Sequence, residues 1–455
     1  MEGIKTLRNL VLLIIIASFI FLWNLGTGSL SSWDEGLYAE VSREMFNSGN
    51  LLNLTWAGQP WSDKPPLYMW VTVFFYKLFG INEFSVRLFS AICGIGTVII
   101  VYLFANMLYS RRAASASALI LLSTWHFLWA GKIGMLDAAI TFFITLSLFL
   151  FKLGEENQLY LFFSCLVFTL AFLTKSFAAL LIPLILFFYI ILTKKFKLIL
   201  RPALWIGVVI SLAILGWWHL QAFSNYGKDF VGGYFIRNLF TRTTQALEGH
   251  SGTIFTYLEV LPNKGRPWAA IGLFALLYAI WRMVINNRNK ELMLPAIWAL
   301  VVLIVFSVVK TKLHWYIVPI YPALSMLVGW GMAKIFKKIT VFIIVIFTLA
   351  SILYLSADKK IFNLDYSPEI KKIAITVRNI IPENKRIYLY NIGDPGIQFY
   401  FGDIRENIAA PEILEKLMKE KNRYFIFEIN YFASLDKLKF LKIIETKNFV
   451  VVKTK

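Results

Sequence analysis

Charged residues and cysteine are both scarce in this chain of 455 residues. Charged side chains make up 16% of the sequence and hydrophobic ones 58%, against roughly 25% and 45–50% in a typical soluble domain. So much apolar surface excludes a disordered chain, and so few polar groups could not cover a single water-soluble fold. The two cysteines, Cys93 and Cys165, both lie in apolar runs. This placement excludes a disulfide framework and a cysteine metal site, and it predicts two small core residues.

Negative charge is the rarer kind. The chain has 46 Lys and Arg against 27 Asp and Glu, a formal net charge of +19. No groove-reading motif or basic helix accompanies this excess, so we expect no nucleic-acid partner. In a membrane protein such an excess is typical of cytoplasmic loops and of contacts with anionic lipid head groups. Glycine-rich nucleotide motifs, a P-loop and internal repeats are also missing from the sequence.

Long apolar runs are what the chain does have. A spanning helix needs about 20 mostly apolar residues, and windows of that size predict about eleven spans, near 7–25, 88–109, 113–131, 135–153, 158–174, 176–193, 203–222, 267–285, 292–309, 314–333 and 339–356. The first run is longer than the roughly 7–15 residues of a signal-peptide core, so we expect an uncleaved anchor. These runs predict a polytopic α-helical membrane protein with about 11–13 spanning helices.

The distribution of positive charge predicts the orientation. With the N-terminus in the cytoplasm, the cytoplasmic loops carry these lysines and arginines and few acids: Lys5, Arg8, Arg111, Arg112, Lys152, Lys194, Lys195, Lys197, Arg201, Arg282, Arg288, Lys290, Lys334, Lys337 and Lys338. This is the positive-inside pattern. Two long loops, near 26–87 and 223–266, then face the exterior of an inner (plasma) membrane together with everything after 356. The predicted domains are therefore 1–356, which spans the membrane, and 357–455 outside the cytoplasm.

The segment 357–455 has a different composition, rich in Lys and Glu and without a spanning run. Helical stretches are expected after Ser367 and near 411–421. Apolar runs lie at 386–392, 397–401, 424–429 and 449–452. This alternation predicts a small α/β domain. Its function cannot be read from the sequence.

Ionisable residues near membrane boundaries are costly and therefore functional candidates. In the first external loop, Asp34 and Glu35 follow the first span, and their two interpretations are a helix start with acids in its first turn or a catalytic carboxylate. Asp63 and Lys64 precede two prolines that forbid helix locally. That segment is either a turn with a surface ion pair or a rigid stretch of backbone that orients an acid and an ammonium group toward one ligand.

Further candidates lie at the same expected face. Asp137, at the start of the fourth span, is either a helix cap or a site residue. The second long loop contains Arg237, Arg242, Glu248 and His250. His250 is either a solvated loop histidine or a metal ligand with Asp63 or Glu248, a weak metal signal on spacing alone. Lys310, Lys312, His314 and Tyr316 surround the start of the tenth span. Positive charge on this side suggests an anionic ligand. His126 and His219 lie among tryptophans inside spans and are expected to be satisfied interface residues.

Several of these segments resemble a known family. The first external loop contains WDEGLYAEVSREM at 33–45, then GN at 49–50, DKPPLYMW at 63–70 and FGINEFSVRL at 79–88. These segments resemble the lipid A 4-amino-4-deoxy-L-arabinose transferases, membrane glycosyltransferases of the GT-C fold related to protein O-mannosyltransferases. The match covers about 30–175 and resumes at His250 and at KTKLHWYIVPIYP, 310–322. The ordered block in the first loop is specific, whereas the later pieces alone are not.

The resemblance implies transfer of a sugar from a polyprenyl-phosphate carrier to lipid A or another envelope acceptor at the outer face of the inner membrane. It aligns Asp34 with the catalytic aspartate and Lys64 with a lysine near the carrier phosphate. Asp137, also assigned as catalytic, and Tyr316 match other cavity residues. It aligns Asp63 and His250 with ligands of a divalent cation, such as zinc, magnesium or manganese. The expected substrate-binding residues are Glu35, Tyr38, Lys64, Arg242, Lys310, Lys312 and Tyr316.

The sequence departs from the family at two of these positions. Leu37 stands where the family often has arginine, and it cannot make a charge-assisted contact with a carrier phosphate. Asp63 is one methylene shorter than the usual glutamate. Direct displacement with inversion at the sugar is the expected chemistry. Three alternatives stay open: a protein hydroxyl as acceptor, another envelope glycan as acceptor, and a transporter of the lipid-linked sugar. A transporter would favour charges near the midplane and repeated halves, and a purely structural role is the least favoured.

Overall fold

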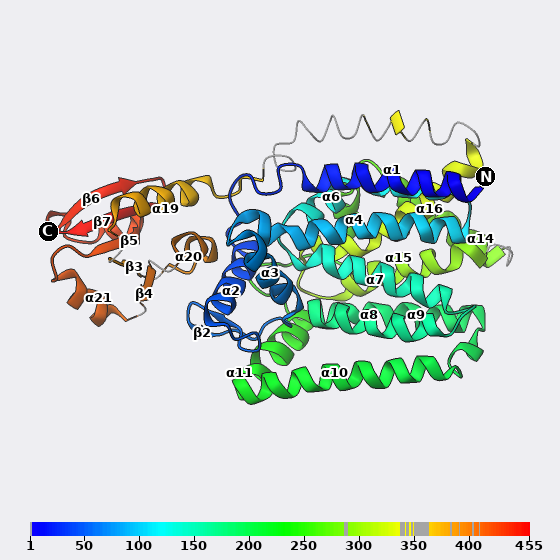
Figure 1. Cartoon of the computed structure of the whole chain (residues 1–455), viewed down its shortest axis with the longest axis horizontal. Helices are drawn as coiled ribbons and strands as arrows, with labels where there is room; N and C mark the ends of the chain where they lie inside the picture. Colours follow the sequence, from blue (N-terminus) through cyan, green and yellow to red (C-terminus); the bar gives the residue numbers. More distant parts are fainter. Residues whose placement is uncertain are drawn as a thin grey trace.

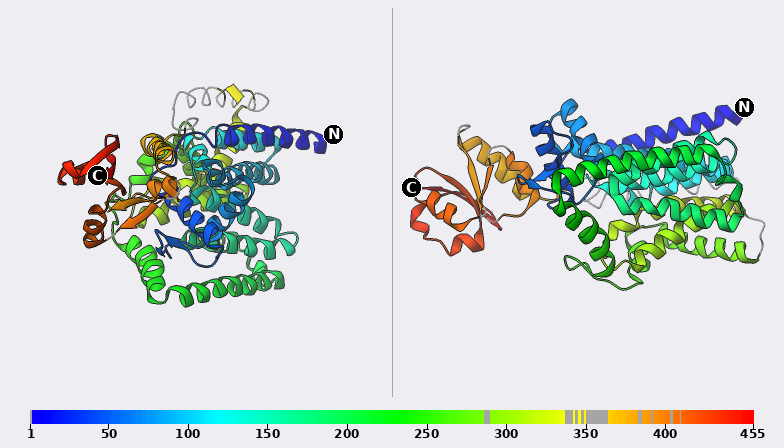
Figure 2. Two further views of the ribbon diagram at one scale, coloured as in Figure 1. Left: turned by 60° about the vertical axis from the view of Figure 1, so that its left-hand side comes forward. Right: turned by 90° about the horizontal axis from the view of Figure 1, so that it is seen from below.

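Long apolar helices pack side by side, and a small α/β unit lies at one end of them in the computed structural model (Figure 1). The structure describes residues 2–285, 290–336, 342, 345–346, 349, 364–382, 385–390, 392–402, 405–408 and 410–455. We call the end of the helical bundle that meets the α/β unit the capped end and the other the open end. Figure 2 shows the same division from two further directions.

The bundle is built from eleven helices of the described residues: α1 (Glu2–Leu22), α4 (Glu83–Leu108), α5 (Arg111–Leu122), α6 (Trp125–Lys132), α7 (Leu136–Leu153), α8 (Leu159–Lys175), α9 (Leu181–Thr193), α10 (Pro202–Tyr226), α14 (Ala269–Ile285), α15 (Lys290–Val308) and α16 (Tyr321–Ile335). Local signals explain several of their starts. Asn82 and Ser110 accept a hydrogen bond from the backbone N–H three residues on and cap α4 and α5, which satisfies a donor that the first helical turn leaves free.

Six helical segments of the described residues are long and apolar enough to cross a membrane, or seven if α5 and α6, bent by 65°, count as one span. Ten of the eleven predicted spans coincide with bundle helices. The eleventh, 339–356, lies outside the described residues apart from positions 342, 345, 346 and 349. The prediction of a multi-span membrane protein is therefore confirmed, while the exact count of about eleven stays a prediction.

One of those six segments, Leu159–Thr193, contains a reversal of the chain. Ser176, after α8, has a positive φ of 37°, and a short 3₁₀ turn, η1 (Ser176–Leu180), leads into α9. Glu155 precedes α8, yet its carboxylate contacts Lys195, which follows α9, at 2.5 Å. The start of α8 and the end of α9 thus lie together at one end of the bundle. The two helices are therefore antiparallel and make two crossings.

Shorter elements gather at the capped end. They are α2 (Asp34–Ser48), the hairpin β1 (Thr55–Trp56) and β2 (Gln59–Pro60), α3 (Leu67–Phe79), α11 (Lys228–Phe230), the π-helix η3 (Val231–Thr241), α12 (Arg242–Thr244), α13 (Thr256–Lys264) and the 3₁₀ helix η4 (His314–Ile320). Another 3₁₀ turn, η2 (Phe196–Leu198), joins α9 to α10 at the open end. The two predicted external loops, 26–87 and 223–266, therefore supply most of the structure around the capped end (Figure 1).

The C-terminal unit is a five-stranded sheet between helices. The strand order is β4 (Arg405–Ile408), β3 (Ile387–Tyr390), β5 (Tyr424–Glu428), β7 (Phe449–Thr454) and β6 (Phe440–Glu445). Strand β3 is parallel to β4 and β5, whereas β7 is antiparallel to β5 and β6. Helices α19 (Pro368–Ile380) and α20 (Pro395–Phe401) share a core with one face, and α21 (Pro411–Met418) and α22 (Ile429–Ala433) with the other. A short 3₁₀ turn, η7 (Lys437–Lys439), precedes β6.

The α/β class of this unit agrees with the sequence prediction, since β3, β5 and β7 lie in predicted apolar runs. The apolar run 397–401 is part of helix α20, and strands β4 and β6 were not foreseen. The central strand β5 is apolar in succession because both of its faces are covered, as is usual for a strand inside a three-layer arrangement. The predicted boundary at 356/357 lies outside the described residues.

Polar contacts fasten the C-terminal unit to the first external loop. Asp365 accepts hydrogen bonds from the backbone and hydroxyl of Ser29, at 2.9 and 2.5 Å. Lys371 forms an ion pair with Glu83 at 2.6 Å. The backbone of Gly36 in α2 approaches α20 so closely that an added Cβ would lie 2.9 Å from the nitrogen of Gly396. The unit therefore rests directly on the helix that begins with Asp34.

Candidate active site

Asp34 is the first residue of α2 and points into the capped end without a hydrogen-bond partner. No ion pair or hydrogen bond joins its carboxylate to any residue that the structure describes, and it does not cap its own helix. Burial raises the pKa of this carboxyl, and the positive charges of Lys64, Lys175 and Arg242 oppose that rise. A partly buried carboxylate that is unpaired and faced by cations is available to a ligand.

Lys64 reaches the same space from the segment before α3. Pro65 and Pro66 follow it, and α3 starts directly after them. Asp63, Lys64 and Pro66 lie in bends, so the lysine is held on a non-helical stretch that is bent where the sequence predicted an extended one. Its Nζ donates a hydrogen bond to Asn238 Oδ1 at 3.0 Å. Asn238 belongs to η3, a π-helix, a form that is rare and frequent at functional sites. Burial lowers the pKa of the Lys64 ammonium to about 8, and the nearby Arg242 guanidinium adds to the shift.

A second set of contacts joins four more elements, α7, α8, α12 and η4. Lys175, the last residue of α8, donates from Nζ to Asp137 Oδ1 at 2.5 Å. The same ammonium lies 5.0 Å from the centre of the Tyr316 ring in η4. Arg242 donates from Nη1 to the Tyr316 hydroxyl at 3.1 Å. Asp137 is therefore no helix cap, because its carboxylate ties α7 to α8.

These cations line one cavity of about 290 Å³. Its polar wall includes Lys64, Lys175, Asn238, Arg242 and Tyr316, and most of the rest of its lining is apolar side chains, chiefly of η1, α9 and α15. Arg242 Nε is buried and has no hydrogen-bond partner among the described residues. Three positive side chains beside an apolar wall fit an anionic group attached to an apolar chain.

Lys175 and Asn238 were not among the residues predicted from the sequence. Lys175 is the last residue of an apolar run. A single lysine at that position is easily interpreted as marking only the end of a spanning helix. The signal that could have found it is the one used for Lys310: a positive charge at the end of the bundle that the positive-inside rule disfavours. Asn238 has no signal of its own, since a neutral amide in a loop is common.

Tyr38 and Glu35 occupy different surroundings although both belong to α2. Burial raises the pKa of Tyr38 well above its ordinary value, and the charges of Asp34 and Asp137 raise it further. Tyr38 thus lies near both acids as a neutral hydroxyl. Glu35 accepts hydrogen bonds from the backbone N–H of Ser31, at 2.7 Å, and Gly134, at 2.8 Å, and from Arg87 at 2.8 Å.

Glu35 was expected to bind substrate, but its carboxylate contacts protein groups instead. Arg87 reaches its second oxygen as well, at 3.3 Å, so both carboxylate oxygens are occupied by the protein. The pair is fully buried, and Arg87 also donates to the carbonyls of Leu25, Thr27, Ser29 and Leu364. Glu35 and Arg87 hold the first loop, α4 and the C-terminal unit together.

Lys312 is also placed differently, because its Nζ donates to the carbonyls of Phe306 and Ser307 at 2.8 and 2.6 Å. It satisfies carbonyl groups at the end of α15, which a helix leaves free. Lys310 is exposed. The backbone of 310–312 donates to the carbonyls of Thr243, Arg242 and His250. This segment therefore fixes the second external loop next to the start of η4.

The expected metal ligands Asp63 and His250 are both partly exposed. Asp63 approaches Gly233 of η3, and the carbonyl of His250 accepts a hydrogen bond from the backbone of Lys312 at 2.9 Å. Within the described part of the chain, no group of three or more His, Cys, Asp or Glu side chains could hold a metal ion. The donor set therefore does not fit a closed protein site, and we derive no chemical step through a metal.

His126 and His219 are satisfied by protein contacts, as expected. His126 is buried, and its ring nitrogens lie 2.9 Å from the Tyr321 hydroxyl and 2.9 Å from His314 Nδ1. His219 Nδ1 lies 2.7 Å from the carbonyl of Leu215. Both cysteines are free, and Cys93 is buried.

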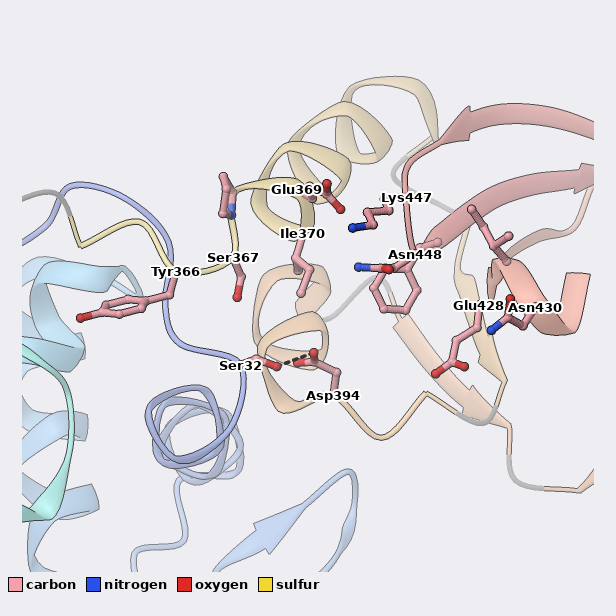
Figure 3. A pocket seen from close by; sticks show the side chains of 13 residues that line it. Ser32, Tyr366, Ser367, Glu369, Ile370, Asp394, Glu428, Asn430, Lys447 and Asn448 are labelled. Atoms are coloured by element: carbon pink, nitrogen blue, oxygen red, sulfur yellow. Dashed lines mark hydrogen bonds between the residues drawn. The ribbon is translucent and has the colours of Figure 1, made fainter. Parts of the chain in front are cut away.

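A polar cavity of about 660 Å³ lies where the C-terminal unit meets the start of α2 (Figure 3). The Ser32 hydroxyl, two residues before Asp34, donates to Asp394 Oδ2 at 2.5 Å there. Three acids line this cavity, Glu369, Asp394 and Glu428, against the single cation Lys447. Figure 3 shows Tyr366 at its edge on the side of the bundle.

Comparison with known proteins agrees with this architecture. Residues 63–219 match the family model described as dolichyl-phosphate-mannose-protein mannosyltransferase. An uncharacterized protein of Aquifex aeolicus is 27% identical over 369 residues, 79% of this chain and 72% of that protein. The undecaprenyl phosphate-alpha-4-amino-4-deoxy-L-arabinose arabinosyl transferase of Yersinia enterocolitica is 30% identical over 332 residues. That match covers 70% of this chain but only 58% of the transferase.

A solved structure extends the likeness to nearly the whole chain. The crystal structure of ArnT from Cupriavidus metallidurans bound to undecaprenyl phosphate superposes with a TM-score of 0.80 at 21% identity, over 97% of each chain. At this identity the likeness shows the fold. Together the comparisons confirm the resemblance and the fold class predicted from the sequence: the chain is a multi-span membrane protein of the GT-C type, similar to the aminoarabinose transferases and related to the protein mannosyltransferases.

Proposed function

We propose that the chain is a membrane glycosyltransferase that moves a sugar from a polyprenyl-phosphate carrier to lipid A. The observation that carries the proposal is the arrangement of Lys64, Lys175 and Arg242 around one part-apolar cavity, with the unpaired Asp34 carboxylate near the same cations. The cations suit the carrier phosphate and the apolar wall suits the carrier chain. The name of the Yersinia relative and the ligand in the Cupriavidus structure support this donor class.

In the proposed reaction the bond between the anomeric carbon and the phosphate oxygen breaks. Its electron pair stays on that oxygen, so negative charge grows on the leaving polyprenyl phosphate. Lys64, Lys175 and Arg242 stabilise this charge in a site of low dielectric, where fixed positive groups have their largest effect. An acceptor oxygen forms the new bond on the opposite face of the sugar, which inverts the anomeric centre. A phosphate acceptor is already ionised and Asp34 orients it, whereas a hydroxyl acceptor gives its proton to Asp34.

The orientation proposed with this function puts the capped end outside the cytoplasm and the protein in the inner (plasma) membrane. Basic residues of the open end support it: Lys152 and Lys195 contact Glu155, and Arg201 donates to the carbonyls of Gly154 and Glu155. Such residues are typical of cytoplasmic loops in contact with anionic lipids. A lipid acceptor would then approach along the outer leaflet.

A protein hydroxyl is the second candidate acceptor, and the match of residues 63–219 to the protein mannosyltransferase model favours it. The two acceptors place different demands on Asp34, which must act as a base only for a hydroxyl. The direct test uses purified protein in lipid nanodiscs, an undecaprenyl-phosphate sugar and either lipid A or a serine- and threonine-containing peptide. Release of undecaprenyl phosphate that depends on lipid A supports the proposal. Release that depends on the peptide alone contradicts the lipid acceptor.

We expect kcat/KM in this assay to fall as pH rises through about 8. Lys64 must be protonated to stabilise the leaving phosphate, and its pKa in the free protein is lowered to about 8, so the charged form is present below this pH and lost above it. Arginine keeps its charge over this range, and Lys64→Arg should therefore move the falling limb to higher pH. An unchanged rate from pH 7 to 9 in the wild type, with the donor in limiting amount, would contradict the role of Lys64.

A divalent cation on Asp63 and His250 stays a prediction of the sequence. Since the protein offers at most these two ligands, donor oxygens or water would have to complete the coordination. We expect one zinc, magnesium or manganese ion per chain in the wild type, measured by inductively coupled plasma mass spectrometry after purification without added metal. His250→Ala should lose it, whereas Glu259→Gln, at an exposed acid of α13, should keep it. Equal metal content in wild type and His250→Ala would rule out this site.

A further inference from the structure

The position of Asp34 depends on the backbone that precedes it. Its carboxylate bonds to none of the residues in the described ranges, so no contact of its own side chain fixes it. Trp33, which precedes α2, makes no side-chain cap hydrogen bond either, although such a bond commonly fixes the first turn of a helix. Two other contacts hold the start of α2, one from within the bundle and one from the C-terminal unit.

The contact from within the bundle is made by Ser31. Its backbone N–H donates to the buried Glu35 carboxylate at 2.7 Å, and its carbonyl accepts a hydrogen bond from the backbone of Gly36 at 3.0 Å. Glu35 is itself held by the ion pair with Arg87. One side of the start of α2 is therefore fixed to the bundle.

The contact from the C-terminal unit is made by Ser32 (Figure 3). Its hydroxyl donates to Asp394 Oδ2 at 2.5 Å, and its carbonyl accepts a hydrogen bond from the backbone of Gly396 at 3.2 Å. The other oxygen of Asp394 accepts from the backbone N–H of Gly396 and Ile397, at 2.8 and 3.3 Å, and so caps α20. Asp394 is thus oriented by its own helix, and both the hydroxyl and the carbonyl of Ser32 are bound at the start of α20.

No side chain separates the starts of α2 and α20. An added Cβ on Gly36 would lie 2.9 Å from the nitrogen of Gly396, and one on Gly396 would lie 3.3 Å from the Cα of Ser32. Backbone therefore packs directly on backbone. Close-packed contacts of this kind transmit a displacement, so a shift of α20 is passed on to the first turn of α2.

We propose that Asp394 is a positioning residue for the catalytic Asp34 and that it acts through the Ser32 hydroxyl. The inference rests on the transfer reaction proposed above, because it explains how the carboxylate used in that reaction is held in place. Asp394 touches no reacting atom. It fixes the backbone two residues before Asp34, so that the unpaired carboxylate stays near Lys64 and Arg242. The C-terminal unit is then required for catalysis.

Ser32→Ala is the mildest test, since it removes one hydroxyl and leaves the cap of α20 in place. We expect kcat for undecaprenyl phosphate release to fall about 10- to 100-fold, as for a misplaced reacting group, with the donor KM changed less than about 2-fold. Asp394→Ala should have at least the same effect, and Ser32→Thr, which keeps the hydroxyl, should recover most of the rate. A kcat of Ser32→Ala equal to that of the wild type would overturn the proposal.

Ser29→Ala is the matched control. Ser29 lies in the same loop, and its hydroxyl donates to Asp365 of the C-terminal unit at 2.5 Å, so the substitution removes the same kind of contact between the same two parts. It should lower the unfolding temperature about as much as Ser32→Ala does and leave kcat unchanged. An equal loss of kcat in both variants would show a general loosening of the unit and contradict a specific role of Asp394.

Combination with Asp34→Asn shows whether the effect passes through Asp34. The carboxylate that the contact positions is already gone in this variant, so adding Asp394→Ala should lower the remaining rate by less than about 2-fold. A contact that only stabilises the fold would lower it by the same factor as in the wild type. The full additional loss in the double variant would therefore overturn the proposal.

Hydrogen–deuterium exchange without substrates separates this inference from the proposed function. The peptide that covers the first turn of α2 should exchange faster in Ser32→Ala than in the wild type or in Ser29→Ala. Faster exchange, together with no release from a polyprenyl-phosphate sugar by the wild type, contradicts the transferase and supports the Ser32 contact as the one that fixes α2. Release by the wild type, with equal exchange and equal kcat in Ser32→Ala, contradicts the positioning role and leaves the transferase.

Discussion

Replacing Asp34 by asparagine should reduce sugar transfer by about 10²- to 10⁴-fold, the range expected for loss of a positioned acid or base. The carboxylate has no hydrogen-bond partner among the described residues, and Lys64, Lys175 and Arg242 act on its charge. The substitution removes that charge and keeps the shape, so the protein should fold normally. Initial rates of undecaprenyl phosphate release, with donor and acceptor both saturating, measure the effect.

Asp229→Asn is the matched control, because Asp229 is an exposed acid of the capped end in α11 and lines neither of the two cavities described. It should retain wild-type turnover. The pH profile then separates the two roles of Asp34. A base for a hydroxyl gives a rate that rises with pH through the raised pKa of Asp34, whereas a positioning residue for a phosphate affects the acceptor KM as well as kcat. Near-normal turnover of Asp34→Asn would remove this residue from the mechanism.

Breaking the ion pair of Glu35 and Arg87 should have the largest effect on stability. Both side chains are completely buried, 2.8 Å apart. Glu35→Ala leaves the Arg87 charge without its carboxylate, which for a buried pair costs about 3–5 kcal/mol. We expect a clear drop in the unfolding temperature, measured in detergent by loss of the monodisperse peak after heating.

The exposed pair of Lys442 and Glu445 provides the comparison, since both side chains are about half exposed. Glu445→Gln should change the free energy of unfolding by only about 0–1 kcal/mol. Glu35→Leu combined with Arg87→Met should recover part of the loss, because no unpaired charge then remains buried. An unfolding temperature of Glu35→Ala equal to that of the wild type would show that the pair is not what holds the first loop to α4 and the C-terminal unit.

The membrane fold could be predicted from the sequence, because apolar runs of spanning length are a local property of the chain. The approach of Asp34, Lys64, Arg242 and Tyr316 to one another is not local, and no periodicity in the sequence predicts it. The family resemblance pointed to Asp34, Lys64 and Tyr316, whereas Arg242 was a candidate for its charge alone. Lys175 was missed because its partner Asp137 is 38 positions away and appears only when α7 and α8 pack.

Two residues expected to bind substrate, Glu35 and Lys312, contact protein groups instead, for the same physical reason. Glu35 and Lys312 stand beside site residues in the sequence, yet one is saturated by Arg87 and two backbone N–H groups, and the other by carbonyls of α15. A sequence reports which side chain is present but not which protein groups already occupy it. Neighbouring helix positions also point in directions about 100° apart, so Asp34 faces the cations while Glu35 faces α4.

Mass spectrometry of lipid A tests the central claim most directly. Cells that lack the gene would be complemented with the wild type or with Asp34→Asn, and their lipid A compared. We expect an added mass of one sugar only in cells with the wild-type protein. Identical lipid A in the deletion strain and both complemented strains would contradict lipid A as the acceptor.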